Sequence, residues 1–379
     1  MSITPASDST SVLRPAPPSV HARENLLDYA PDEAIARLRD WCTARNEPAY
    51  RATQIFARLW QRPVAHFAEM TELPVRLRDA LAADFDMPSL ELATSQLSKD
   101  GTEKFLFRLD DGQLIETVAI PEDQRLTLCI SSQAGCALQC AFCATGAMGF
   151  QRNLRPSEIA GQVRALRMLT PARLATNIVF MGMGEPLMNW NAVSPTLSLL
   201  NDPRALGIGA RHITISTVGV LPGIVALGER PEQFRLAISI HAPTDALRRE
   251  LMPINIKYPL SDVIAAAATF DRRVTFEYVL LGDVNDRPEH ATQLAALARD
   301  CRAFVNLIPL HPGGTMGFHP SPPLAISAFA RTLRARGVET AVRRSRGLDI
   351  SAACGQLRTE RLGRRLPIAP HDDGEVDVA

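Results

Sequence analysis

The sequence has no long apolar run and no excess of charge of either sign. No stretch of its 379 residues approaches the roughly 20 apolar residues that a membrane-spanning helix needs. Residues 1–22 are rich in Pro and Ser and contain no apolar core typical of a signal peptide, so we expect a disordered tail and a cytoplasmic protein. Lys and Arg together number 41, as do Asp and Glu, so the overall charge carries no signature of nucleic-acid binding.

Charge is nevertheless uneven near the C-terminal end. The stretch 331–365 contains ten arginines against three acidic residues, a balance of about +7, and an acidic segment follows it. Such a basic face fits a polyanionic partner, although a solvated helix surface explains it equally well on charge alone.

Cysteines are also few, and they lack the pattern of a disulfide scaffold. There are seven, an odd number, and three of them lie within eight residues, at Cys136, Cys140 and Cys143. In a chain without an export signal, this clustering indicates metal ligation or catalysis in a reducing compartment.

The type of metal follows from the ligands that are missing. A zinc site usually needs two separated cysteine pairs or added histidines. No second pair is formed by the remaining cysteines, which are Cys42, Cys129, Cys301 and Cys354. Because thiolates select soft metals, we expect the three-cysteine loop to hold an iron–sulfur cluster with one iron that has no protein ligand.

The pattern of apolar residues changes along the chain. Residues 24–90 have apolar side chains at helical spacing, and the runs Lys104–Leu109 and Gln113–Ile120, joined by Asp-Asp-Gly, predict a β-hairpin. From about residue 125, apolar strand-like runs alternate with helical segments, a pattern typical of a parallel sheet covered by helices. The seven runs are 126–131, 177–181, 212–217, 235–240, 274–281, 304–309 and 338–342.

These patterns predict an α/β fold in which six or seven strand–helix units form a full or partial (β/α) barrel, with a small N-terminal helical domain and a linking β-hairpin. The expected divisions are a tail at 1–22, a helical accessory domain at 23–95, the hairpin at 100–122, a catalytic core at 123–357, and a basic-then-acidic tail at 358–379.

Polar residues and glycines gather where the predicted strands end. In β/α barrels, reacting groups lie at the carboxyl ends of the strands. The residues at these ends are Gly184 and Glu185 after the second strand, Ser216 in the third, Ser239, Ile240 and His241 at the fourth, and Asn306 in the sixth. Since the cysteine loop follows the first strand, we expect all of them to share one site.

Several motifs resemble a known family. The spacing Cys-x3-Cys-x-aromatic-Cys is similar to the signature of the radical S-adenosylmethionine (SAM) superfamily, whose barrel is of the partial (β/α)6 type. Over roughly residues 24–357 the chain resembles the RlmN/Cfr family of RNA adenosine methyltransferases. Met183–Leu187 is similar to the RlmN branch, since the Cfr branch more usually has alanine where Pro186 stands. The stretches that carry the resemblance are 128–132, 135–150, 180–189, 236–243, 305–309 and 346–357.

The resemblance implies an activity and its partners. The expected product is an adenosine methylated at C2 in the peptidyl transferase centre of 23S rRNA, and at the adenosine next to the anticodon in some tRNAs. One [4Fe-4S] cluster on Cys136, Cys140 and Cys143, two SAM molecules per turnover and an electron donor such as flavodoxin are implied. We expect a monomer that binds RNA through its helical unit and its basic stretch.

The same resemblance implies residue roles. Cys354 would carry the methyl group, Cys129 would pair with it in a transient disulfide as the product leaves, and Glu116 would accept a proton. By composition alone the two cysteines are core thiols and Glu116 is an ordinary strand residue. The residues that would line SAM are Gly184, Glu185, Ser216, Ser239, Ile240, His241 and Asn306. After Pro309 the sequence departs from the Trp-Asn-Pro type segment of many relatives, which bears on the balance between rRNA and tRNA.

Two alternatives remain open at this point. A Cfr-like enzyme would methylate C8 of the adenosine instead of C2. A non-enzymatic iron–sulfur electron carrier that binds RNA would need a cluster ligated entirely by cysteine, and it would give no reason for Cys354.

Overall fold

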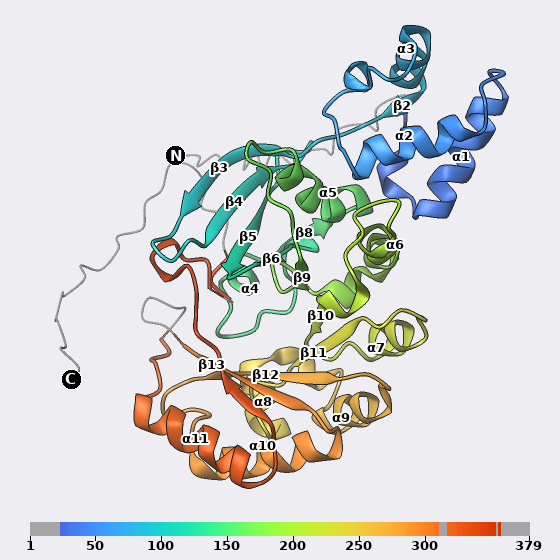
Figure 1. Ribbon diagram of the computed structural model, residues 1–379. Helices are drawn as coiled ribbons and strands as arrows, with labels where there is room; N and C mark the ends of the chain where they lie inside the picture. The colour runs from blue at the N-terminus through green and yellow to red at the C-terminus, as the bar shows by residue number, and fades with distance from the viewer. Residues whose placement is uncertain (1–22, 311–316, 354, 358–379) are drawn as a thin grey trace, which may run out of the picture.

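A ten-stranded mixed sheet organises the protein (Figure 1). The computed structural model describes residues 23–310, 317–353 and 355–357. Seven neighbouring strands run parallel, in the order β6, β9, β10, β11, β12, β13 and β14. Their bounds are Arg125–Cys129, Asn177–Phe180, Ile213–Thr217, Arg235–Ser239, Val274–Leu280, Phe304–Pro309 and Thr340–Val342. Each lies within two residues of a predicted run, and because β14 is an edge strand the barrel is partial, as expected.

The antiparallel part of the sheet extends beyond the predicted hairpin. Strands β4 (Glu103–Arg108) and β5 (Leu114–Glu122) form that hairpin, and β5 pairs with β6, so it is continuous with the barrel sheet. The edge strand β3 (Glu91–Leu97) pairs with β4, whereas the sequence-based prediction extended the helical domain to residue 95. Six of its seven side chains are exposed, so no alternation of buried residues marked it as a strand.

Helices connect successive parallel strands. Neighbouring helices pack on one another, α5 on α6, α9 on both α7 and α10, and α10 on α11. The bounds are α5 Pro156–Arg167, α6 Trp190–Asn201, α7 Leu221–Gly228, α8 Asp245–Leu251, α9 Leu260–Thr269, α10 Pro288–Asp300 and α11 Pro323–Ala335. Short 3-10 helices are η1 Leu26–Asp28, η2 Phe67–Glu69, η3 Pro186–Asn189, η4 Ala210–His212, η5 Pro253–Ile256 and η6 Leu348–Ile350. Among the helices of the described residues, none combines the length and the apolar character that crossing a membrane requires.

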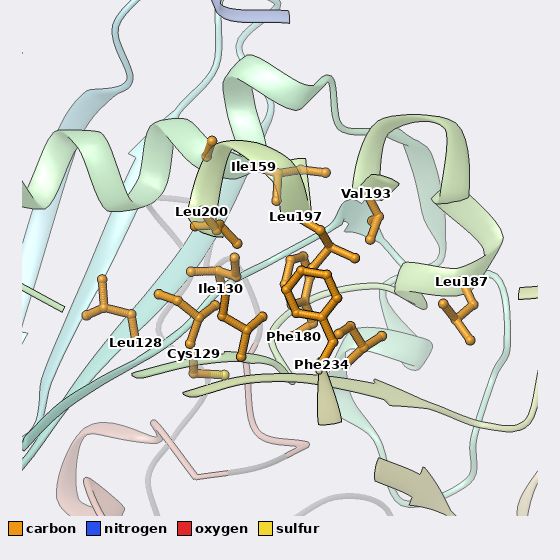
Figure 2. Close-up of a cluster of buried hydrophobic side chains, with 14 of the residues drawn as sticks. Leu128, Cys129, Ile130, Ile159, Phe180, Leu187, Val193, Leu197, Leu200 and Phe234 are labelled. Atoms are coloured by element: carbon orange, nitrogen blue, oxygen red, sulfur yellow. The ribbon is translucent and has the colours of Figure 1, made fainter. Parts of the chain in front are cut away.

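The core between sheet and helices explains how the first strand is oriented. Leu128 and Ile130 are fully buried and point toward side chains of the covering helices, among them Leu197 and Leu200 (Figure 2). Because successive side chains of a strand point to opposite faces, Cys129 faces the other side of the sheet, which is the inside of the barrel.

The N-terminal unit is a helical layer that is attached firmly to α5. It contains α1 (Pro31–Thr43), α2 (Tyr50–Trp60) and α3 (Val75–Asp84), with β1 (Glu24–Asn25) paired to β2 (Phe85–Asp86). Arg164 of α5 is fully buried beneath it and donates to the carbonyl oxygens of Leu59 (2.9 Å) and Val64. A buried guanidinium with several acceptors makes separation of the two units costly.

Candidate active site

The cysteine loop follows β6 and lies at the carboxyl ends of the barrel strands. It is flanked by the short strands β7 (Gln133–Gly135) and β8 (Phe150–Asn153) and leads into α4 (Ala144–Ala147). Gly135 has φ +75° and a side chain there would lie 1.9 Å from the carbonyl oxygen of Gly149, so only glycine fits. On the opposite side, the Ala141 N–H donates to the carbonyl of Leu251 at 2.9 Å, which ties the loop to α8.

The three cysteines of the loop line one cavity of about 150 Å³, which we call the smaller cavity. Cys136 and Cys140 are buried and Cys143 is half-buried. Burial raises the pKa of the Cys136 thiol to about 11 and raises the pKa of Cys140 further. Neutral thiols at this depth need a cationic partner to become thiolates, and a soft metal is the partner that thiolates prefer.

The arrangement suits a cluster better than a single ion. Among the described residues, no group of three or more His, Cys, Asp or Glu side chains is arranged to hold one metal ion. A four-iron cluster binds each of its cysteines through a different iron, so its ligands surround a volume and do not converge on one point. Three cysteines around one cavity fit that requirement.

Glu185 lines the smaller cavity, and both oxygens of its carboxylate accept hydrogen bonds. They accept the Leu187 N–H (3.0 Å) and the Val218 N–H (2.9 Å), and burial raises the pKa of Glu185 to about 7. Its own N–H donates to the Gln133 amide oxygen at 2.8 Å. At Gly184, which has φ +97°, a Cβ would lie 2.5 Å from that of Gln133, so the motif needs glycine for close packing.

His241 lines the same cavity as a neutral imidazole. Its Nδ1 accepts the Val279 N–H at 3.0 Å, which places the ring hydrogen on Nε2. Burial, with a contribution from the Arg248 charge, lowers the pKa of His241 to about 3. The ring of Phe142 packs edge-on against it, 4.7 Å between centroids.

The remaining predicted SAM-lining residues divide into two groups. Ser216 and Ser239 line the smaller cavity. Ile240 and Asn306 are not among the residues that line it, but both contact Glu277, which is. The Ile240 N–H donates to the Glu277 carbonyl at 3.0 Å, and the Asn306 side chain donates to the Glu277 carboxylate at 2.9 Å.

A second, larger cavity of about 540 Å³ adjoins the first. Both are lined by Phe142, Met181, Val279, Ile308 and Gly355. The larger cavity is also lined by Cys129 and by three basic residues of the C-terminal stretch, Arg343, Arg344 and Arg346.

Known proteins resemble this chain over most of its length. Residues 130–295 match the radical SAM superfamily, and residues 24–86 match the ribosomal RNA large subunit methyltransferase N-terminal domain. A probable dual-specificity RNA methyltransferase RlmN of Gemmatimonas aurantiaca is 79% identical over 94% of this chain and 99% of its own length. The dual-specificity RNA methyltransferase RlmN of Anaeromyxobacter dehalogenans is 46% identical over 88% of this chain and 92% of its own. The chain belongs to the RlmN family.

A solved structure agrees with this assignment. The crystal structure of a radical SAM methyltransferase from Sphaerobacter thermophilus is 44% identical, covers 89% of this chain and all of its own, and superposes with a TM-score of 0.83. Membership of the family confirms the predicted class, a radical SAM methyltransferase, and implies a [4Fe-4S] cluster and SAM as cofactors.

Of the residues predicted to handle the methyl group, Cys129 lines the larger cavity and Glu116 is not among the residues that line it. Cys354 lies outside the described residues, but its neighbours Ala353 and Gly355 line the larger cavity together with Cys129. Glu116 of β5 is buried and does not line either cavity. It forms an ion pair with Lys104 at 3.2 Å, and its carbonyl accepts the Ser131 hydroxyl at 2.6 Å.

Sequence reasoning missed two buried residues of this RlmN-family site. Glu277 sits mid-strand in a buried apolar run, and its charge in such a run was a signal that could have found it. Arg248 of α8 is fully buried behind the smaller cavity and donates to the carbonyls of Ile240 (3.3 Å) and Ser239 (3.3 Å). It stabilises the strand end that carries His241.

Proposed function

We propose that the protein transfers a methyl group from SAM to C2 of an adenosine in 23S rRNA, and to the adenosine next to the anticodon in some tRNAs. The observation that carries this proposal is the pair of adjoining cavities. One is lined by three cysteines and the other by Cys129, by both neighbours of Cys354 and by three arginines. The name of the relatives, dual-specificity RNA methyltransferase, supports the choice of substrates.

Each cofactor has side chains suited to it. Cys136, Cys140 and Cys143 would hold the cluster, which when bound supplies the electron that cleaves SAM and starts radical chemistry. Ser216, Ser239 and His241 offer two hydroxyls and an Nε2–H on the cavity wall for a polar ligand. The Glu185 carboxylate lies beside them, and the backbone carbonyls at this edge would accept the amino group of SAM.

Two thiols would have separate roles in the transfer, one carrying the methyl group and the other helping to release the product. Cys354 would take a methyl group as a thiolate, two SAM molecules being used per turnover, and Cys129 would form a transient disulfide with it when the product leaves. The lining of one cavity by Cys129 and by residues 353 and 355 supports this role. Glu116, which forms an ion pair with Lys104, would accept a proton, as the resemblance to the family implies.

The larger cavity would receive the adenosine. A base must leave its stack to reach a cavity of this kind, and arginines at the rim would bind the flanking phosphates. Arg344 is exposed, whereas Arg343 and Arg346 are half-buried, so the charge extends from the surface inward. We also propose that the protein is a monomer, that it is located in the cytoplasm and that it receives electrons from a donor such as flavodoxin.

The test is anaerobic reconstitution with iron, sulfide, SAM, a reductant and an rRNA fragment, followed by nucleoside analysis. Cys354→Ala should abolish methylation while leaving the visible absorption of the cluster intact. Cys301→Ala is the matched control, since Cys301 lies at the end of α10 and its thiol donates to the Ile264 carbonyl at 3.4 Å. If the Cys354→Ala variant still methylated RNA, the proposal would be wrong.

The product distinguishes the alternatives. A C8-methylated adenosine, separated by chromatographic retention, would make the enzyme Cfr-like. An electron carrier would give no methylated nucleoside at all, with or without Cys354.

A further inference from the structure

The segment around residue 354 is held on both sides by contacts from distant parts of the chain. We call residues 347–353 and 355–357 the C-terminal strap. Five of its residues line the larger cavity on either side of residue 354, among them Ala352 and Gln356. Neither the family's cofactors nor its predicted residues account for the way in which the strap is attached.

The first attachment is the turn between β3 and β4. The Asp100 carboxylate accepts the Gly347 N–H at 2.9 Å, and the Asp349 carboxylate accepts the Ser98 hydroxyl at 2.5 Å and the Lys99 N–H at 3.1 Å. Burial acts to raise the pKa of the Asp100 carboxyl. Backbone hydrogen bonds, above all the one from Gly347, outweigh this effect and lower the pKa to about 2. The carboxylate is therefore ionised at neutral pH, where it is a strong acceptor.

The turn and the strap also approach too closely for a side chain between them. Gly347 has φ +62°, and a Cβ there would lie 2.8 Å from that of Ala352 and 3.0 Å from the Thr102 Cγ2. The Ala352 N–H donates to the Gly347 carbonyl at 2.9 Å, which closes the strap into a turn. This end of the strap is therefore fixed by packing as well as by hydrogen bonds.

The second attachment is α4, which begins directly after the cluster ligand Cys143. The Ala144 N–H donates to the Gly355 carbonyl at 2.8 Å. The buried Thr145 hydroxyl donates to the Leu357 carbonyl at 2.6 Å. The far side of the strap is thus attached to the loop that carries the three cysteines.

A third contact lies between these two. The Lys104 ammonium is 3.5 Å from the Ser351 carbonyl and 3.2 Å from the Glu116 carboxylate. The strand β4 therefore connects the strap with the predicted proton acceptor.

We propose that Asp100 and Thr145 are positioning residues, which fix the two flanks of residue 354 relative to the cysteine loop and so set the rate at which Cys354 is methylated. The inference rests on the proposed function, in which Cys354 is the nucleophile. In that step the Cys354 thiolate forms a bond to the methyl carbon of SAM, the S–CH3 bond of SAM breaks, and S-adenosylhomocysteine leaves. Releasing one end of the strap lengthens the free loop and reduces the fraction of time in the reactive geometry.

The experiment compares two aspartates with the same local role. Asp100 accepts the Thr102 N–H (2.9 Å) and Asp111 accepts the Gln113 N–H (3.1 Å), so each closes a turn at one end of β4. Only Asp100, of these two, also binds the strap. Reconstituted full-length enzyme is mixed with SAM that carries a deuterated methyl group, quenched at intervals, and assayed by peptide mass spectrometry for label on Cys354.

Asp100→Ala should slow labelling of Cys354 by about tenfold, and Asp111→Ala by less than about twofold, because only the first change frees the strap. Iron content, the electron paramagnetic resonance signal of the cluster and SAM affinity should match the wild type in both. Asp100→Asn keeps one acceptor and should recover part of the rate. On the α4 side, Thr145→Val should slow labelling and Thr145→Ser should restore it.

Each outcome decides between the two proposals. Equal labelling rates for Asp100→Ala and Asp111→Ala, or loss of the cluster signal in Asp100→Ala, would overturn the positioning role. If Asp100→Ala does not fold, Thr145→Val takes its place with Thr145→Ser as its control, since only the valine removes the hydroxyl that donates to the Leu357 carbonyl, and equal labelling rates for these two variants would overturn the positioning role. A wild-type enzyme that methylates RNA without label on Cys354 would overturn the proposed function, and the positioning role with it.

Discussion

The two adjoining cavities share a wall but are built from opposite kinds of side chain. The smaller has three cysteines, the carboxylates of Glu185 and Glu277 and a neutral histidine, and it has no Lys or Arg among the described residues that line it. The larger has three arginines near its rim and one acidic residue, Glu122. A sulfonium cofactor is favoured by the first set of charges and a polyanionic RNA by the second. The acidic lining of one cavity and the basic rim of the other therefore favour different substrates.

Removing a cysteine from the smaller cavity should have the largest effect. Cys140→Ala removes a buried thiol that we propose as a cluster ligand, and we expect loss of the cluster and no detectable methylation, since three thiolates are the minimum that a cluster with one open iron requires. Cys42→Ala is the control, because Cys42 is equally buried but lies in α1, away from both cavities. Iron analysis and visible absorption measure the result. Retention of the full cluster in Cys140→Ala would mean that the cavity is not its site.

Changes to the larger cavity should act on RNA and leave the cluster alone. Arg344→Ala with Arg346→Ala should weaken RNA affinity about tenfold at low salt and make the slope of log affinity against log salt shallower by roughly one to two. The matched pair is Arg331→Ala with Arg336→Ala, which removes equal charge from exposed positions on and just after α11. Filter binding at several salt concentrations measures both. Equal effects from the two pairs would show that only net charge matters.

The smaller cavity was more predictable from sequence than the larger. Its cysteines are close in the chain, and its other residues end consecutive strands, so short motifs and strand periodicity brought them together. Asn306 was expected at the ligand, but its side chain donates to the carboxylate of Glu277, which no motif singled out. A side chain of a buried strand can be assigned to a cavity only when the neighbouring strands are known.

The contacts around the larger cavity depend on residues that are far apart in sequence. Asp100 and Gly347 are separated by 247 positions, and nothing in either local sequence indicates the other. Edge strand β3 was missed for the same reason, since pairing with β4 fixes it and burial does not. Long-range contacts that consist of one hydrogen bond leave no periodic pattern in the sequence.

The smallest predicted effect concerns how the free energy of unfolding depends on pH through a residue of the smaller cavity. His241 in the smaller cavity has its pKa lowered to about 3 from an ordinary 6.5, because burial disfavours the imidazolium. The unfolded chain binds a proton below pH 6.5 and the folded one does not, so stability from this residue is present above pH 6.5 and is lost as the pH falls toward 3. Between pH 8 and pH 6 the loss is about 1 kcal/mol. The measurement is denaturant titration of the iron-free proteins at pH 8 and at pH 6. The free energy of unfolding should decrease between these pH values by about 1 kcal/mol less in His241→Gln than in the wild type. If the free energy of unfolding of His241→Gln decreased as much as that of the wild type, His241 would be protonated by solvent in the folded state. The smaller cavity would then be as open to water as its neighbour.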